Sequence, residues 1–325
     1  MDPVSHALLG RTIAAAAFGE RPLPRGMKAA AVLGALSPDV DSVLMTRWDV
    51  YLRAHEIGTH SLAGAVMTGL ASAALVRAVL GKSSYRGLAV AAVLGAGSHL
   101  LADIAAGGRL RLLWPASSIV ASFPLVAMGD PWTLSILFVG ALALWRRQDH
   151  VQTARVTLLM VVVFLLAKAV LLAAALARTP PDAARGPETM AVVDARWGSL
   201  TEWSVCDRTV DALQCRGIDA GGHTPVLLVS QPVHPESPLV RSSRSLATVR
   251  NFLAVHHLPF AVERPSSHGQ VTVLWSDIRF CWPTHAGLDS IECFLWFGGV
   301  FGPDGRAVAE EVRVGSWTRT LPPER

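Results

Sequence analysis

The stretch GSHLLAD, residues 97–103, places a histidine and an aspartate four positions apart within an otherwise apolar run. On a helix, His99 and Asp103 would lie one turn apart on the same face. The run from Gly87 to Ala106 contains no other ionisable side chain, and it is long enough to cross a bilayer. A carboxylate near the middle of a membrane helix costs about 2.5–3.5 kcal/mol on insertion scales. We therefore expect this pair to serve an ion, a proton or a metal.

The composition changes in character part-way along the chain. Of its 325 residues, 51% are hydrophobic and 17% are charged, and the mean hydropathy is +0.38. Long runs rich in Ala, Leu and Val fill residues 1–177, after which the chain becomes polar and Pro-rich. We predict a membrane α-helical bundle of about five or six spans in residues 1–178. A linker over 179–188 and a small soluble α+β domain over 189–325 would follow. The net charge of +4 gives no support to a nucleic-acid partner.

The apolar runs and their breaks give the expected order of the spans. These are Val4–Phe18, Ala29–Met45, Ser61–Leu80, Gly87–Ala106, Trp132–Trp145 and Val156–Ala177. Pro38 interrupts the second run, because proline disfavours helix for the residue before it. Asp39 and Asp41 are then expected at a broken helix end. The Pro-interrupted piece between residues 114 and 131 is expected either to be re-entrant or to belong to the fifth span.

The C-terminal part contains short β-type runs and all four cysteines. The expected strands include Val226–Val229, Gln270–Trp275 and Cys293–Phe297, and one helix is expected over Ser243–Val255. An even number of cysteines in one soluble domain indicates two disulfides and an oxidising compartment. Pairing of sequence neighbours, Cys206–Cys215 and Cys281–Cys293, is the simplest of three possibilities. Four unpaired thiols are the alternative, and a zinc site is less favoured because no Cys-x-x-Cys spacing occurs.

Six histidines and aspartates fall at corresponding ends of the first four runs. If the runs alternate in direction, these residues meet near one membrane face. Imidazole and carboxylate ligands suit Zn²⁺, Mn²⁺ or Fe²⁺. Six ligands exceed the three that one catalytic zinc usually needs, so one or two ions are expected. The candidate metal ligands are His6, Asp39, Asp41, His60, His99 and Asp103. Asp41, Asp130 and His55 are the candidates for acid–base chemistry, although His55 lies in a loop where an interfacial role is the alternative.

The basic residues predict which way the site faces. More Lys and Arg lie in the loops away from the site than in those beside it. The distal residues are Arg21, Arg25, Lys28, Arg77, Lys82, Arg86, Arg146, Arg147 and Arg155, and the proximal ones are Arg47, Arg53, Arg109, Arg111 and Arg178. By the positive-inside rule, the site faces away from the cytoplasm. Six spans would deliver the C-terminal domain to that same side, which agrees with its expected disulfides.

An ordered series of short motifs runs through the chain. They are MDPVSHALLG at 1–10, GALSPDVD at 34–41, HEIGTHSL at 55–62, SHLLAD at 98–103, LWP at 113–115 and GDP at 129–131. In this order they resemble the YdjM/YbcI/YfhP-type membrane-bound metal-dependent hydrolases. WSDIRF at 275–280 is similar to a strand motif of the same family, so the resemblance extends over nearly the whole chain.

The resemblance implies a multi-span protein with a metal site and hydrolase activity, distantly similar to zinc-dependent phospholipase C. Two departures from the family pattern occur. Glu56 stands where the family has an arginine, and IAAGG at 104–108 replaces a Thr-x-Tyr-Gly pattern. Both departures adjoin the expected ligands without replacing them, so they bear on how a substrate is oriented.

The sequence thus favours a metal-dependent hydrolase in the bacterial cytoplasmic (inner) membrane, surrounded by membrane lipids. A phosphoester or lipid-type substrate is expected, because the site would lie at headgroup depth. An ion- or proton-coupled transporter is the alternative, although no inverted repeats are evident. A non-catalytic membrane anchor for the C-terminal domain is a further alternative.

Overall fold

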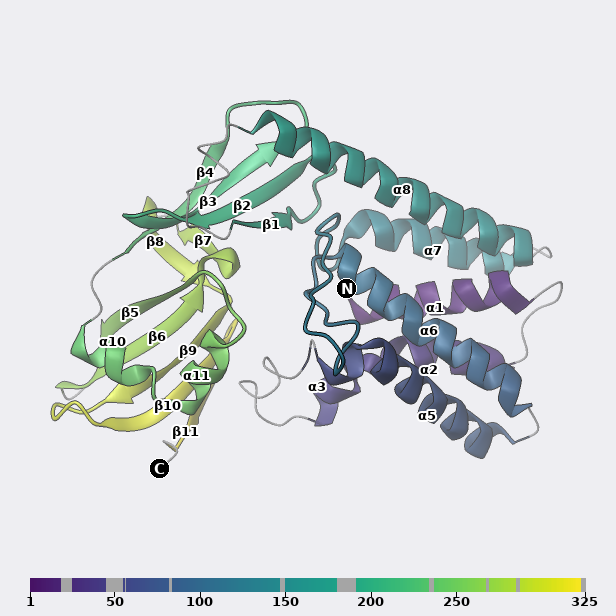
Figure 1. The fold of residues 1–325 in the computed structure, drawn as a ribbon, viewed down its shortest axis with the longest axis horizontal. Coiled ribbons are helices and arrows are strands. Elements are labelled where there is room, and N and C mark those ends of the chain that lie inside the picture. Colours follow the sequence, from purple (N-terminus) through teal and green to yellow (C-terminus); the bar gives the residue numbers. More distant parts are fainter. Residues whose placement is uncertain are drawn as a thin grey trace. The chain divides into compact units, whose positions relative to one another are not determined.

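The computed structural model describes residues 1–18, 25–44, 55, 57–81, 84–146, 150–179, 191–233, 237–266, 269–284 and 287–322 (Figure 1). The chain divides into two compact units. The first holds the helices through residue 174 together with residues 194–202, and the second holds the β-rich remainder. Residues 194–202 therefore group with the helices, although they follow the expected linker. Residues 180–188 of that linker lie outside the described part.

The first unit is built of helices connected by irregular segments. In chain order these are α1 (Pro3–Phe18), α2 (Arg25–Leu36), the 3₁₀ turn η1 (Ser37–Asp39), α3 (Val40–Leu44), the 3₁₀ turn η2 (Gly58–His60), α5 (Leu62–Leu80), α6 (Tyr85–Ala105), α7 (Pro131–Arg146) and α8 (His150–Arg178). As expected, the helix before Pro38 ends early, and the chain continues there as a 3₁₀ turn.

Three of the described helices, α5, α6 and α8, are long and apolar enough to cross a membrane. The five or six spans expected from the sequence are therefore not confirmed. At about 1.5 Å per residue, the 16-residue helices α1 and α7 fall short of a bilayer core, and the 12-residue α2 is shorter still. Breaks that hydropathy alone does not show, such as Pro38, account for the difference.

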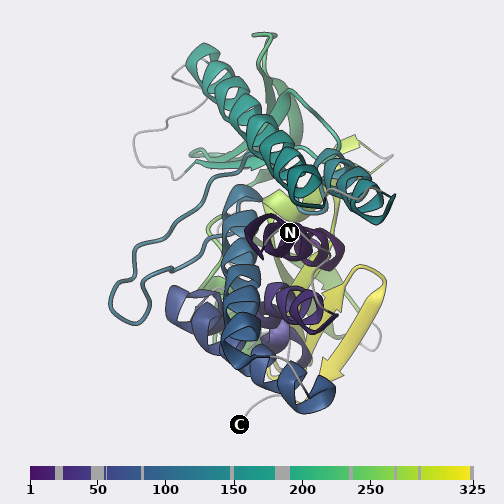
Figure 2. The ribbon, with the colours of Figure 1, turned by 90° about the vertical axis from the view of Figure 1, so that its right-hand side faces the viewer.

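Helix α6 forms the centre of the helical unit. It packs against α1, α2 and α5, and Figure 2 shows it alongside α1 and α2. Glycines allow this close packing. A Cβ atom on Gly95 would lie 2.2 Å from the carbonyl oxygen of Ala31, and one on Gly34 would lie 2.1 Å from that of Ala92. The backbones of α2 and α6 thus approach more closely than any larger residue would permit.

Residues 107–130, between α6 and α7, are mainly irregular. Isolated bridges pair Ala106 with Pro124 and Leu110 with Ala121. The amide of Phe123 donates to the carbonyl of Ile104 (2.8 Å), and the amide of Leu62 donates to the carbonyl of Leu112 (2.9 Å). The segment is therefore attached to the last turn of α6 and the first turn of α5.

The β-rich part contains two main sheets, one hairpin and two short helices. The first sheet has the order β1 (Val192–Ala195), β2 (Glu202–Arg208), β3 (Ala212–Asp219), β4 (Val226–Pro232). The second has the order β11 (Trp317–Leu321), β10 (Ala307–Val314), β9 (Leu295–Phe301), β6 (Val271–Asp277), β5 (Pro259–Pro265). β7 (Cys281–Thr284) pairs with β8 (Gly287–Cys293), and the helices are α10 (Pro238–Ser243) and α11 (Ala247–Leu253). The expected strands correspond to β4, β6 and β9. The helix expected over Ser243–Val255 corresponds to the shorter α11, and α10 precedes it as a helix that the sequence did not predict.

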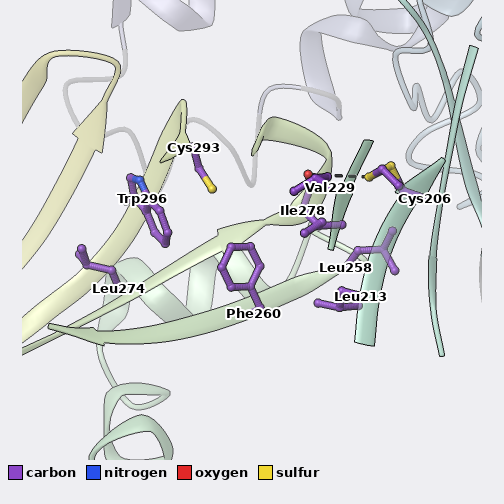
Figure 3. Packing of buried hydrophobic residues seen from close by; sticks show 10 residues of the cluster. Cys206, Leu213, Val229, Leu258, Phe260, Leu274, Ile278, Cys293 and Trp296 are labelled. Carbon is purple, nitrogen blue, oxygen red and sulfur yellow. Dashed lines mark hydrogen bonds between the residues drawn. A yellow bond between two sulfur atoms is a disulfide. The ribbon is translucent and has the colours of Figure 1, made fainter. Parts of the chain in front are cut away.

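The four cysteines form two disulfides, as expected from their positions. Cys206 is bonded to Cys215 across neighbouring strands, and Cys281 to Cys293 across the β7–β8 pair. The first disulfide lies beside a buried apolar cluster that includes Phe260, Leu274 and Trp296 (Figure 3). Cys206 and Cys215 are themselves buried members of this cluster, which also includes side chains of β3, β4, β5 and β6. A second buried cluster, with Phe252 and Phe297, packs α10 and α11 onto the second sheet.

Candidate metal centre

His6 is placed by a capping arrangement at the start of α1. The carboxylate of Asp2 accepts hydrogen bonds from the amide (2.9 Å) and the hydroxyl (2.6 Å) of Ser5. Pro3 begins the helix, where its fixed φ and missing N–H carry no cost. The imidazole of His6, one residue further on, is fully buried and stacks on that of His99, with ring centroids 3.8 Å apart.

His99 and Asp103 occupy one face of α6, as their spacing predicts. Nε2 of His99 lies 3.0 Å from Oδ2 of Asp103. Nδ1 of His99 donates to the carbonyl oxygen of Ala35 at 2.7 Å. Because a carbonyl only accepts, this bond assigns the proton to Nδ1 and leaves a lone pair on Nε2. In a 3₁₀ turn, the carbonyl of Ala35 would accept from the amide of residue 38. That residue is Pro38, which has no N–H, so the turn does not compete with His99 for this carbonyl.

His60 is oriented by the hydroxyl of Thr59. That hydroxyl donates to Oδ2 of Asp41 (3.1 Å) and lies 3.2 Å from Nδ1 of His60. With its own proton directed to Asp41, the hydroxyl oxygen accepts from Nδ1 of His60. The lone pair of His60 is therefore on Nε2, which lies 3.1 Å from Nε2 of His99.

His55 is oriented by Asp41 directly. Its Nδ1 lies 3.0 and 3.1 Å from the two carboxylate oxygens of Asp41, so Nδ1 carries the proton. Its Nε2 lies 3.7 Å from Oδ1 of Asp39. Asp41 thus orients two histidines: His55 through a direct hydrogen bond and His60 through the hydroxyl of Thr59. In both, Nε2 is directed away from Asp41.

Five of the six predicted metal ligands converge in this structure. Their separations are 3.4 Å for His60–Asp39, 3.5 Å for His99–Asp39, 3.6 Å for His60–Asp103 and 3.2 Å for His6–Asp103, in each case between Nε2 and a carboxylate oxygen. Three overlapping groups have all their ligand atoms within 4.8 Å of one another: His6, Asp39 and His99; Asp39, His55 and His60; His60, His99 and Asp103. Asp41 belongs to none of these groups and lies behind His55.

These separations fit a metal site. Two ligands at about 2.0–2.1 Å from a tetrahedral zinc are about 3.3–3.4 Å apart, and the observed separations are close to this value. Among the described residues, Nδ1 of His6 is buried without a hydrogen-bond partner, and Nε2 faces the carboxylate of Asp103 at 3.2 Å without a geometrically good hydrogen bond. A buried imidazole with poorly satisfied nitrogens is costly, and a cation between Nε2 and the carboxylate would satisfy both. The amino group of Met1 also contacts Asp103.

The site is accessible from the side of Asp39 and His55. Their side chains are 28% and 23% exposed, whereas those of His6, His60 and His99 are at most 1% exposed. Burial opposes ionisation of Asp39, but the bond to His60 and the nearby His99 outweigh it and lower the pKa of Asp39. The more exposed carboxylate of the cluster is therefore ionised at neutral pH.

Asp130 lies at the start of α7. Its Oδ2 accepts hydrogen bonds from the amide and hydroxyl of Thr133, both at 2.7 Å. This is the geometry of an N-cap, with Pro131 as the first helical residue. Nearby, the ammonium of Lys168 donates to the carbonyl oxygens of Ser199 and Leu200. Asp130 belongs to none of the three His/Asp groups found among the described residues.

The sequence comparison identifies the helical part. The family model of the YdjM inner membrane protein matches residues 1–177, which is more than half of the chain. The chain belongs to this family. The match ends in α8, so the motif at 275–280 lies outside it, and the resemblance is shown for the helical part alone. No curated protein and no solved structure matches the chain.

Three groups that orient the site histidines were not identified from the sequence: the cap formed by Asp2 and Ser5, the hydroxyl of Thr59 and the carbonyl of Ala35. The Asp-Pro-x-Ser opening is a readable capping signal for α1, and Thr59 directly precedes His60. These two could have been found from their residue types. The carbonyl of Ala35 carries no sequence signal of its own, apart from the proline three residues later.

Proposed function

We propose that this YdjM family member is a metal-dependent hydrolase whose site lies at the membrane–water interface. The observation that carries the proposal is the common orientation of His55, His60 and His99. In each, Nδ1 is held by an acceptor and Nε2 faces the same group of carboxylates. Such outer contacts typify histidines that bind metal. If these residues served only as helix caps or ion pairs, there would be no need for all three histidines to carry the proton on Nδ1.

We assign the binding of one or two divalent cations, with zinc favoured, to five residues. They are His6, Asp39, His60, His99 and Asp103. A bound cation would act as a Lewis acid toward water and toward a phosphoryl or carbonyl oxygen. Asp41 orients His55 and His60 rather than serving as a ligand, which differs from the role that the sequence suggested.

His55 is the group best placed to accept a proton. It is the most exposed of the four histidines, and its Nε2 carries the lone pair while Asp41 holds Nδ1–H. In hydrolysis of a phosphoester, the oxygen of water forms a bond to phosphorus as the bond to the leaving oxygen breaks. The proton that water loses passes to Nε2 of His55, which then returns it to the leaving oxygen.

We further propose that the site and the β-rich part face the extracytoplasmic side of the cytoplasmic membrane. Two disulfides are favoured by an oxidising compartment. The excess of basic residues in the loops expected on the other side supports the same orientation.

Metal analysis of the purified full chain tests the proposal with a matched pair of variants. Asp103→Asn removes a carboxylate from the cluster, whereas Asp130→Asn changes a buried aspartate outside it and keeps a good N-cap residue. We expect wild type and Asp130→Asn to bind metal and to hydrolyse phosphoester, and Asp103→Asn to lose both properties. If Asp103→Asn keeps full metal content, or if the wild type binds no metal, the proposal is wrong.

A further inference from the structure

The segment that follows Asp103 exposes a group of apolar side chains. We define residues 110–124 as the apolar loop. Its exposed fractions are 54% for Leu113, 42% for Trp114, 75% for Ile119, 39% for Val120 and 63% for Phe123. No described part of the chain covers these side chains, and in water such a patch is unfavourable.

The base of the apolar loop is attached to structure, so its tip has a defined position. Leu110 pairs with Ala121, and the amide of Leu62 donates to Leu112. Leu110 is itself buried in a cluster with Leu100 and Ile104 of α6. The loop is thus held at the end of α6, a helix long and apolar enough to cross a membrane, and in a spanning α6 this end would lie near the lipid headgroups.

The loop and its flanking residues carry only positive formal charge, although the carboxylate of Asp194 lies near Gly107. Residues 104–129 contain no Asp or Glu, and their only charged residues are Arg109 and Arg111. Both arginines are half-buried at the base of the loop. Cations below an apolar tip can contact lipid phosphates while the tip enters the acyl-chain region.

The polar backbone near the tip is partly satisfied within the loop. The amide of Ser117 donates to the carbonyl of Leu113 (3.0 Å), and the amide of Ile119 donates to the hydroxyl of Ser117 (3.2 Å). Pro115 has no N–H. These bonds reduce the cost of moving the tip out of water.

The loop also adjoins the metal centre. The amide of Gly108 donates to the carbonyl oxygen of Asp103 at 2.8 Å, so the base of the loop begins one turn beyond a candidate ligand. We propose that the apolar loop inserts into the adjacent leaflet and admits a membrane phospholipid, headgroup first, to the site. The lipid as substrate rests on the proposed function, whereas insertion of the loop does not.

Fluorescence quenching of the full chain in phosphatidylethanolamine/phosphatidylglycerol vesicles tests insertion. All four native cysteines are in disulfides, so Ile119→Cys offers one thiol for a fluorophore. Met67→Cys, on α5 and 70% exposed, is the control for lipid, and Val210→Cys, 93% exposed between β2 and β3, is the control for water.

We expect a doxyl-labelled phospholipid to quench the probe at residue 119 as strongly as at residue 67, and aqueous iodide to quench only the probe at residue 210. Iodide quenching at residue 119 would place the loop in water and overturn the proposal. Protection from both quenchers would indicate that protein covers the loop, either the β-rich part or a second copy, and would overturn it equally.

Ile119→Asp tests whether the loop is needed for turnover of a membrane lipid but not for the hydrolysis reaction itself. We expect this variant to keep its bound metal and to lose most of its turnover of vesicle phospholipid, whereas its turnover of a water-soluble phosphoester falls less. Equal loss on both substrates contradicts lipid admission through the loop. Insertion at residue 119 with bound metal but without hydrolysis of either substrate by the wild type would instead contradict the proposed function.

Discussion

At the scale of single residues, the two aspartates after Pro38 differ in role despite being two positions apart. Asp39 directs Oδ1 toward His60 and His99 at 3.4 and 3.5 Å. Asp41 contacts the other face of the site, where it binds Nδ1 of His55 and the hydroxyl of Thr59. Both are aspartates close to Pro38, so the sequence identifies the pair as candidates. It does not distinguish the carboxylate that joins the His/Asp groups from the one that contacts His55 and Thr59.

This difference predicts distinct outcomes for two matched variants. Asp41→Asn should weaken metal affinity by about 10–100-fold, which is typical of lost outer contacts, and excess metal should restore hydrolysis. Asp39→Asn removes a ligand, so excess metal should not restore it. Titration of the apo-protein with Zn²⁺ measures both affinities.

Thr59→Val serves as an intermediate control, since it removes the contact that links His60 to Asp41. Its affinity should fall in the same direction as that of Asp41→Asn. A loss of function in Asp41→Asn that excess metal does not reverse would make Asp41 a ligand itself.

At the scale of elements, the position of His99 depends on how closely α2 approaches α6. Gly95 lies one turn before His99 on α6, and a Cβ there would lie 2.2 Å from Ala31 O and 2.8 Å from Ala35 N. The same approach brings the Ala35 carbonyl within 2.7 Å of His99 Nδ1. Gly95, together with Gly34, thus permits the close α2–α6 packing that brings the Ala35 carbonyl to Nδ1 of His99.

Gly95→Ala should accordingly destabilise the bundle by about 1–3 kcal/mol, the usual cost of overpacking, and should lower metal affinity. Gly97→Ala is the matched control on the same helix, because nothing lies within 4 Å of its Cβ position. It should be neutral or stabilising by up to about 1 kcal/mol, since alanine favours helix over glycine. Thermal unfolding in detergent, with and without Zn²⁺, compares the two. Equal melting temperatures for both variants would contradict the close α2–α6 packing.

Much of the element order was predictable, and the reasons are local. Pro38 and Gly107 end helices through their own backbone preferences, and Ser61 accepts from Gly64 N as an N-cap should. The number of spans was not predictable in this way. Pro38 predicts the break in the run Ala29–Met45, but the sequence does not give the length of the helix before it, which is the 12-residue α2, too short to cross a bilayer core.

At the scale of the whole molecule, the two units are stabilised by different means. The helical unit relies on close packing of small residues, whereas the β-rich unit has two disulfides and a buried carboxylate. Burial of Asp277 disfavours its charge, but His256 and the ion pair with Arg279 outweigh this effect and hold the pKa of Asp277 well below its ordinary value of 3.8. The ionised form therefore stabilises the folded state.

The sign of the pH dependence follows from this lowered pKa. Stabilisation by Asp277 is complete above the pKa of the unfolded chain and is lost progressively as the pH falls from about 5 through the lowered pKa of the folded state. We expect the β-rich unit to lose about 1 kcal/mol between about pH 5 and pH 3. Asp277→Asn should be less stable at neutral pH and show a smaller change. Near-UV circular dichroism of the buried tryptophans follows the transition, and an equally steep change in both proteins would exclude Asp277 as its source.

The placement of every candidate ligand within α1 to α6 has a consequence for biosynthesis. The last of them is Asp103, and the first cysteine, Cys206, follows 103 residues later, which takes about 5–20 s to translate at ordinary elongation rates. The candidate ligands are thus all synthesised while the cysteines are still unmade. A nascent chain arrested before residue 206 already carries every candidate ligand, so its metal content would show whether metal can bind before the disulfides form.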